Sequence, residues 1–150
     1  MLLRLDHISK LYTVGDTVIT ALDDLSLDVE EGEYIAVTGH SGSGKSTLLQ
    51  IASFLDTPTS GKIYLRDTQI DTFSEADLAK LRNKEIGFVF QQFNLLGKTS
   101  ALENVGLPLI YANVSDTERK QRAKKCWKTL GLEIGWRIRA RNFPEGNNSV

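Results

Sequence analysis

The chain has 150 residues, 41% of them hydrophobic, 25% charged and 8% aromatic, a composition of soluble globular proteins rather than disordered or fibrous ones. It holds one cysteine, no signal-peptide core at its start and no uncharged apolar run of the roughly 18 residues that a membrane helix needs, so we expect a cytoplasmic protein. The net charge of −1 combines an acidic part, residues 1–115, with a basic part, residues 116–150, and an overall basic footprint for nucleic acid is absent.

The first part of the chain is predicted to form strands. Leu2–Tyr12 favours a strand, and two shorter strand patterns follow at Val18–Leu22 and Leu25–Val29. Tyr34–Thr38 is a nearly continuous apolar run, which is typical of a central parallel strand covered on both faces.

A helix is predicted at Lys45–Leu55. Apolar residues at positions 48, 51, 52 and 55 have the i, i+3, i+4, i+7 spacing of one helical face. Leu49 and Phe54 widen that face, so we expect this helix to be largely buried.

Strands and helices alternate further along the chain. Lys62–Leu65 predicts a short strand, and Ser74–Asp77 resembles a capping box that opens a helix toward Lys84. Ile86–Phe90 is a second apolar run of the buried-strand type. This alternation indicates an α/β domain.

A further capping box, Ser115–Glu118, opens an amphipathic helix. Its apolar face would carry Ala123, Cys126, Trp127 and Leu130, and its other face Lys120, Lys124 and Lys128. We interpret the lysines as a solvated face and expect Cys126 and Trp127 to be packed rather than functional.

The strongest motif is Gly39-His-Ser-Gly-Ser-Gly-Lys-Ser46, which fits the P-loop (Walker A) pattern G-x-x-x-x-G-K-[ST]. Glycines let consecutive backbone N–H groups turn toward phosphate oxygens, and the helix that begins near Lys45 adds the positive end of its dipole. Lys45 would neutralise the β- and γ-phosphates, and the Ser46 hydroxyl would ligate Mg²⁺. The predicted nucleotide-binding residues of this loop are Gly39, His40 (through its backbone), Ser41, Gly42, Ser43, Gly44, Lys45, Ser46 and Thr47.

Six stretches in a fixed order make the chain similar to a known family. They are residues 8–12, 21–27, 39–49, 55–61, 86–96 and 103–108. With them the chain resembles the ATPases of ATP-binding cassette (ABC) transporters, and within these most closely the ATPase subunits of lipoprotein-releasing and macrolide-exporting systems. The Phe-Val-Phe-Gln and Leu-Asp-Thr-Pro-Thr-Ser-Gly blocks distinguish this family from kinases and GTPases, which share the phosphate loop.

The resemblance implies an α/β fold of the P-loop NTPase (ABC ATPase) type. This fold has a mixed sheet with an N-terminal antiparallel β part and the start of a helical subdomain, and we expect it to be incomplete here. Residues 1–93 would form the ATP-binding core, residues 94–141 the start of the helical subdomain, and residues 142–150 a divergent tail.

The resemblance also implies ATP and Mg²⁺ as cofactors and assigns roles to single residues. Tyr12 matches the aromatic residue that stacks on adenine. Gln91 matches the glutamine that reaches Mg²⁺ and the attacking water and couples the site to the membrane partner. The predicted catalytic residues are therefore Lys45 and Gln91, and the predicted metal-binding residues are Ser46 and Gln91.

Three elements of the family pattern are missing from the sequence. Pro144 is followed by Glu-Gly-Asn-Asn-Ser-Val rather than a Leu-Ser-Gly-Gly-Gln signature, and neither the Walker B acid nor the switch histidine is found. We expect a C-terminally truncated ATPase that binds ATP but hydrolyses it poorly. Its implied partners are an integral-membrane permease, which would hold it on the inner face of the cell membrane, and a second ATPase subunit in a head-to-tail dimer.

Two alternatives remain open. One is a non-hydrolysing nucleotide-binding scaffold that docks on a membrane partner, as in division-associated relatives of the family. The other is a small-molecule kinase, although no arginine-rich lid follows the helices. The sequence does not name a transported substrate, because the membrane subunit selects it.

Overall fold

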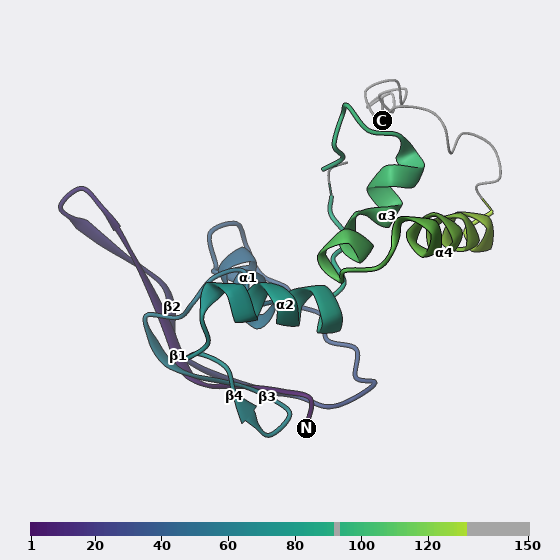
Figure 1. Ribbon diagram of the computed structural model, residues 1–150. Helices are drawn as coiled ribbons and strands as arrows, with labels where there is room; N and C mark the ends of the chain where they lie inside the picture. The colour runs from purple at the N-terminus through teal and green to yellow at the C-terminus, as the bar shows by residue number, and fades with distance from the viewer. Residues whose placement is uncertain (92–93, 132–150) are drawn as a thin grey trace. The chain divides into compact units, whose positions relative to one another are not determined.

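The computed structural model describes residues 1–91 and 94–131, and it divides into two compact units (Figure 1). The first unit is Met1–Arg82, and the second begins at Asn83. Each unit is described by itself.

The first unit is built on a four-stranded antiparallel sheet. Its strands are β1 (Leu3–Val14), β2 (Thr17–Val29), β3 (Ser60–Leu65) and β4 (Thr68–Gln69), in the order β2-β1-β3-β4. The two short strands predicted within residues 18–29 are one continuous strand, β2. Because β3 pairs only with the first part of β1, the distal half of the β1–β2 hairpin extends as a two-stranded ribbon (Figure 1).

The core of the first unit lies between this sheet and helix α1 (Lys45–Ala52). Side chains alternate across a strand, so Leu5 of β1 and Ile63 of β3, which pair with each other, lie on the same face of the sheet. The buried set is Leu5, Ile8, Leu22, Leu48, Ile51, Phe54, Ile63, Leu65, Ile70 and Leu78. A helix is therefore confirmed here, but it ends at Ala52 rather than Leu55. The expectation that it is largely buried is wrong at Leu49, which is 58% exposed, whereas Phe54 is buried. Only one side of α1 contacts the sheet.

Helix α2 (Glu75–Glu85) begins at the predicted capping position. The Ser74 hydroxyl accepts from the Asp77 backbone N–H at 3.3 Å and donates to the Asp77 carboxylate at 2.6 Å. Arg82 ties this helix to the end of α1, because its guanidinium donates to the Phe54 carbonyl at 2.5 Å and pairs with Glu75 at 2.6 Å.

Neither predicted parallel strand forms. Tyr34–Thr38 and Ile86–Phe90 are without strand assignment, and Tyr34 and Val89 are almost completely exposed. A central parallel strand needs hydrogen-bonded neighbours on both sides, and no strand of the described residues pairs with either segment. Both segments are as apolar as buried strands. Within residues 1–91 and 94–131, however, no strand pairs with them to bury them.

The second unit contains helices α3 (Ala101–Tyr111) and α4 (Asp116–Thr129), which pack on each other. Ser100 and Glu103 form a capping box at the start of α3, with the Glu103 carboxylate accepting from the Ser100 N–H at 2.7 Å. The predicted cap of α4 is confirmed, because the Ser115 side chain accepts from the Glu118 N–H. Gly106 allows the close approach of the two helices, since a Cβ there would lie 3.2 Å from Cγ of Arg119.

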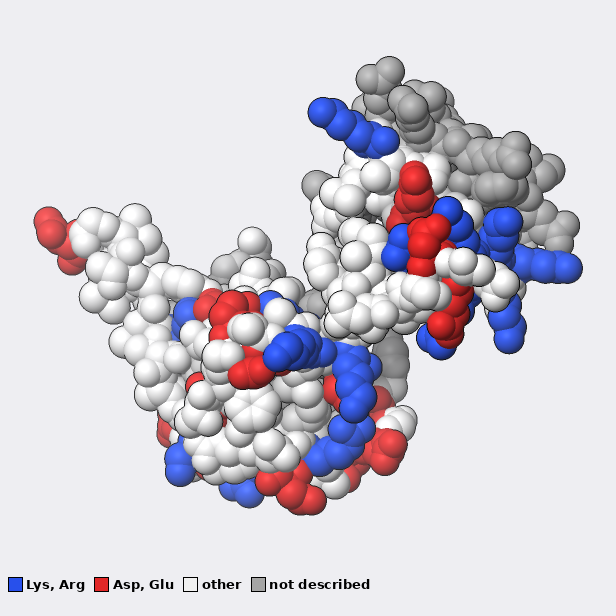
Figure 2. All heavy atoms as spheres, in the orientation of Figure 1, with Lys and Arg blue, Asp and Glu red and all other residues white. Residues whose placement is uncertain are grey.

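The outer surface of α4 carries charges of both signs (Figure 2). Asp116 pairs with Lys120 at 2.6 Å, one turn along the helix, which adds to helix stability. Ala123 is buried, whereas Cys126 is exposed, so the expectation that this cysteine is packed is wrong. Gly106 of α3 faces Arg119 and Ala123 of α4, so the buried side of α4 includes Ala123 and not Cys126.

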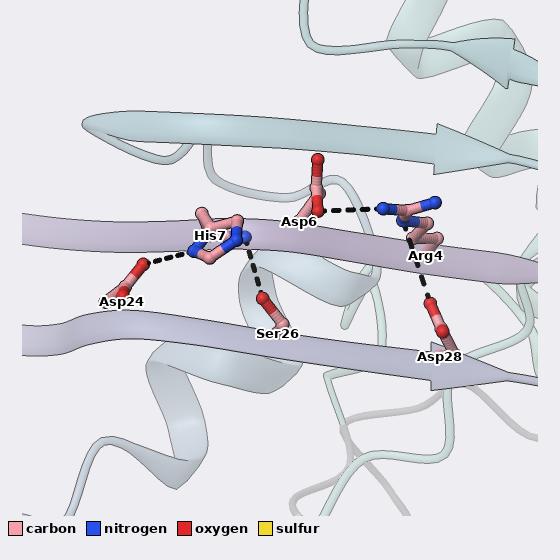
Figure 3. Close-up of polar contacts among 6 residues, drawn as sticks. All are labelled: Arg4, Asp6, His7, Asp24, Ser26 and Asp28. Carbon is pink, nitrogen blue, oxygen red and sulfur yellow. Dashed lines mark hydrogen bonds and ion pairs between the residues drawn. The ribbon is translucent and has the colours of Figure 1, made fainter.

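An irregularity in the β1–β2 ladder brings polar side chains together (Figure 3). His7 and Asp24 both have left-handed backbone angles, with φ of 51° and 47°. His7 Nδ1 lies 2.7 Å from the Asp24 carboxylate, and the His7 backbone N–H donates to the Ser26 hydroxyl at 3.0 Å. The Ser26 hydroxyl therefore satisfies the His7 N–H at the bulge, and the contact of His7 with Asp24 adds a bond between side chains.

The Asp24 carboxylate, through its hydrogen bond and its charge, raises the pKa of His7 above the ordinary value of 6.5. The protonated pair stabilises the hairpin below pH 6.5, and this contribution is lost as the pH rises through the folded-state pKa. We expect Asp24→Asn to return the pKa of His7 toward 6.5. An NMR titration in a His40→Gln background, where His7 is the only histidine, measures it; an unchanged pKa would show that the pair does not form in solution.

Candidate functional site

The predicted phosphate loop connects the exposed segment 34–38 to α1. Its turn is closed by a hydrogen bond from the Ser43 N–H to the His40 carbonyl at 3.3 Å. Gly42 and Gly44 have φ of 80° and 82°, the left-handed region that glycine adopts without a steric penalty. The loop therefore has the backbone geometry that the glycine pattern predicts.

Helix α1 begins directly at the loop, with Gly44 as its N-cap. Gly44 offers no side chain to cap the helix, and no acidic residue lies in the first turn. The first backbone N–H groups of a helix have no partner within it, and together with the helix dipole they favour an anion at this end. The start of α1 is thus suited to phosphate oxygens.

The Lys45 side chain folds back over the loop. Its ammonium donates to the His40 carbonyl at 2.5 Å and lies 3.3 Å from the Ser43 hydroxyl. An ammonium that donates to neutral groups can transfer to an anion, because hydrogen bonds between ionised partners are stronger than those to a carbonyl. The cation is therefore positioned at the loop.

The remaining loop residues differ in their exposure and their contacts. Ser46 is exposed and Thr47 half-buried at the start of α1. The His40 ring contacts the next peptide, with Nδ1 2.8 Å from the Ser41 carbonyl oxygen. Nucleotide binding by His40, Ser41, Ser46 and Thr47 stays a prediction.

Two glycines of the loop sit where a side chain would collide. A Cβ at Gly44 would lie 2.4 Å from the Ala21 carbonyl oxygen of β2, and one at Gly39 would lie 2.7 Å from Oγ of Ser43. At Gly42 the space is open within 4 Å. Gly44 therefore attaches the loop to the sheet, whereas Gly42 is required only for its backbone angle.

Tyr12 lies near the distal part of β1, paired with Ile19, and it is held by two neighbours. Its hydroxyl donates to the Asp56 carboxylate at 2.9 Å, and the Lys10 ammonium lies 5.1 Å from its ring centroid. Lys10 also pairs with Asp56 at 2.6 Å. Burial opposes ionisation of Asp56, but the hydrogen bonds from Lys10 and Tyr12 outweigh it and lower the pKa of this carboxyl below its usual range.

Sequence reasoning missed the contribution of Lys10 and Asp56. Asp56 belongs to the Leu-Asp-Thr-Pro-Thr-Ser-Gly block, which served only to distinguish families. A carboxylate within a short block that joins a helix to a strand was the available signal, but nothing in the sequence links it to Tyr12, 44 positions earlier.

Gln91, predicted to reach the metal and the water, is an exposed residue of the second unit. The loop residues and Tyr12 belong to the first unit, so the role of Gln91 at the site stays a prediction. Among the described residues, no cluster of three or more His, Cys, Asp or Glu could hold a metal ion. Mg²⁺ in nucleotide sites keeps several waters and binds through phosphates and few protein ligands, so the Ser46 hydroxyl is a suitable protein donor without such a cluster.

Comparison with known proteins decides the family. The ABC transporter family model matches residues 22–148. The chain belongs to the ABC transporter family.

Its resemblance to lipoprotein-releasing and macrolide-exporting proteins is confirmed by two relatives of this ABC protein. It is 44% identical to the lipoprotein-releasing system ATP-binding protein LolD of Bordetella avium over 142 residues, which are 95% of this chain and 60% of LolD. It is 42% identical to the macrolide export ATP-binding/permease protein MacB of Hyphomonas neptunium over 131 residues, 87% of this chain and 20% of MacB.

A solved structure confirms the fold class of this ABC protein. The dimeric ATP-binding cassette MJ0796 of Methanocaldococcus jannaschii, in a post-hydrolysis state with ADP and Pi, superimposes with a TM-score of 0.81 at 42% identity. The match covers 91% of this chain and 60% of the MJ0796 chain, so the protein described here spans about three fifths of such a cassette. Within residues 1–91 and 94–131, no helix combines the length and apolar character needed to cross a bilayer.

Proposed function

We propose that this chain binds Mg-ATP at residues 39–47 and, as the ATP-binding subunit of an ABC transporter, energises a membrane permease in export or lipoprotein release. The observation that carries the proposal is the Lys45 ammonium held over a glycine loop at the uncapped start of α1. A cation, free N–H groups and a helix dipole at one place favour a polyphosphate over a neutral ligand.

Each predicted residue has a defined task in this proposal. The backbone of the loop surrounds the β- and γ-phosphates, Lys45 neutralises them, and Ser46 offers its hydroxyl to Mg²⁺. A magnesium ion held there would neutralise part of the negative charge of the phosphates. Gln91 orients the attacking water, and Tyr12 offers a ring face to adenine.

The relatives support the proposed partners. LolD is named for a lipoprotein-releasing system, MacB carries its ATP-binding part in one chain with a permease, and MJ0796 forms a dimer of cassettes. We propose the same assembly here, peripheral on the inner face of the membrane through the permease, with a head-to-tail second ATPase subunit. The 150 residues contain no Leu-Ser-Gly-Gly-Gln stretch, so we expect them to bind ATP and hydrolyse it poorly.

Removal of the loop cation tests the proposal. Lys45→Ala is expected to weaken ATP binding about 10- to 100-fold, since a hydrogen bond to a charged group contributes roughly 1.5–3 kcal/mol. Calorimetric titration of the 150-residue chain with Mg-ATP measures the loss, and Lys62→Ala, an exposed lysine on β3, is the matched control.

Three other outcomes would contradict parts of the proposal. Equal affinities of Lys45→Ala and wild type would exclude the loop as the binding site. Steady phosphate release by the purified chain, abolished by Lys45→Ala, would contradict poor hydrolysis. Survival of cellular function in the Lys45→Ala strain would favour the non-hydrolysing scaffold instead.

A further inference from the structure

Helix α1 ends in a hydrogen-bonded cap that determines where Asp56 lies. Phe54 takes a left-handed angle, φ 61°, and its N–H donates to the Ile51 carbonyl at 3.0 Å, while the Leu55 N–H donates to the Gln50 carbonyl at 2.8 Å. These two bonds are those of a Schellman motif, with a buried phenylalanine where glycine is usual. The Asp56 N–H donates to the same Gln50 carbonyl at 3.2 Å, so the carboxylate follows the helix without a flexible linker.

The segment after this cap is attached to β1 at several points. The Lys10 ammonium of β1 donates to Asp56 at 2.6 Å and to the Thr57 carbonyl at 2.7 Å. The Thr59 N–H donates to the Ser9 carbonyl at 2.8 Å, and its hydroxyl accepts from the Leu11 N–H at 3.0 Å. The lysine and aspartate side chains are 12% and 29% exposed, so solvent screens this pair less than a surface pair.

These contacts restrain the Tyr12 ring in two ways. Asp56 holds the hydroxyl at 2.9 Å, and the Lys10 ammonium covers one ring face at 5.1 Å from the centroid. Rotation about the side-chain bonds of Tyr12 would break the hydroxyl contact and the cation–π contact together. The ring is therefore held in one orientation, in a residue that stays partly exposed.

One rigid helix thus joins the two halves of the proposed ATP site. Lys45 and the phosphate loop lie at the start of α1, and Asp56 lies just beyond its end. The eight residues of α1 span about 12 Å, and the backbone hydrogen bonds of the helix fix the position of Asp56 relative to Lys45. A base platform placed at a constant distance from the phosphate loop selects a nucleotide over a free polyphosphate.

We infer that Asp56, with Lys10, is a positioning residue for nucleotide binding: it holds the Tyr12 ring as a base platform in fixed geometry to the phosphate loop. The inference rests on the proposed ATP site. Asp56 touches no nucleotide in this arrangement and acts through Tyr12 alone. Its loss therefore weakens recognition of the base and spares recognition of the phosphates.

The test compares ATP with inorganic tripolyphosphate, which has the phosphates and lacks the base. Tyr12→Ala is expected to raise the Kd for Mg-ATP about tenfold, the size of one lost stacking contact. We expect Asp56→Ala to raise it about fivefold and to leave the Kd for tripolyphosphate within twofold. In the Tyr12→Ala background, Asp56→Ala is expected to have no further effect on ATP.

Asp71→Ala is the matched control. Asp71 is also a partly buried carboxylate of the first unit, accepting from the Ile63 N–H at 3.1 Å and from Gln69 at 3.0 Å, but it contacts neither Tyr12 nor Lys10. Its removal is expected to lower stability without separating ATP from tripolyphosphate. Tyr12→Phe, which keeps the ring and removes the hydroxyl, is the conservative variant and should resemble Asp56→Ala.

Each result has one meaning. If Asp56→Ala weakens ATP and tripolyphosphate equally, or weakens ATP further in the Tyr12→Ala background, the residue is only structural and the inference is overturned. If Asp56→Ala and Tyr12→Phe bind ATP as wild type does, the inference fails while the proposed ATP site stands. If the wild-type chain binds neither ligand, the proposed function itself fails and the inference with it.

Discussion

Gly61→Ala is expected to lower the free energy of unfolding by about 2–4 kcal/mol, because it combines a strained backbone angle with a collision. Gly61 has φ of 96°, a region that L side chains rarely adopt. A Cβ at this position would lie 2.3 Å from the His7 carbonyl oxygen and 2.7 Å from that of Asp6. Both obstacles are backbone atoms, which cannot rotate away as a side chain can.

The backbone of His7 also has little freedom to move. It sits in the bulge of β1, held by the contacts of His7 with Asp24 and Ser26, and β3 pairs with β1 on either side of that bulge. Accommodating a methyl group at Gly61 would require β3 to separate from β1. Leu5 and Ile63, which face each other across these strands, are buried in the core.

Urea unfolding of the 150-residue chain, followed by circular dichroism, measures the loss. Gly32→Ala is the matched control, because Gly32 has φ of 79° but open space within 4 Å. It carries the angular strain without the collision and should cost about 1 kcal/mol. If both variants lose the same stability, the contact with the bulge does not matter and the strained angle alone explains Gly61.

Local signals in the sequence predicted the elements that depend on near neighbours. Ser74, Ser100 and Ser115 begin their helices, and the caps at Ser74 and Ser115 are those that we predict from the sequence. A cap needs two or three adjacent residues, so its chemistry is visible in a short window. Gly42 of the phosphate loop is predictable for the same reason, because it serves only a backbone angle at its own position.

Features that depend on distant residues were not predictable in this way. The side chain of Tyr12 meets Asp56 because α1 ends where it does, and no spacing rule relates positions 12 and 56. The apolar runs at residues 34–38 and 86–90 are a second example of a feature that depends on distant residues. Their composition is that of buried strands, but burial requires partners that the run does not itself specify.

Gly44→Ala is the second substitution with a large expected effect, and it acts on both the fold and the site. Gly44 is the N-cap of α1 with φ of 82°, and a Cβ there would lie 2.4 Å from the Ala21 carbonyl oxygen and 3.1 Å from Cδ2 of Leu22. The leucine methyl can move, but the carbonyl belongs to strand β2 and cannot. We expect a loss of about 2–4 kcal/mol in the free energy of unfolding.

Nucleotide binding should fall with stability in this variant. Relief of the collision requires the start of α1 to move away from β2, which displaces the loop N–H groups that are proposed to contact phosphate. Displacement of several hydrogen bonds at once should weaken ATP binding more than about tenfold. Calorimetric titration at a temperature where the variant is still folded, as checked by circular dichroism, separates this effect from unfolding.

Gly42→Ala discriminates between a steric and an angular cause. Gly42 lies in the same loop with nearly the same φ, 80°, but a Cβ there meets nothing within 4 Å. It should therefore lose only about 1 kcal/mol of stability. If Gly42→Ala and Gly44→Ala destabilise the chain equally, the loop is not attached to β2 through Gly44. A large difference between them would show that this one close contact holds the phosphate loop on the sheet, and therefore that the sheet positions the site.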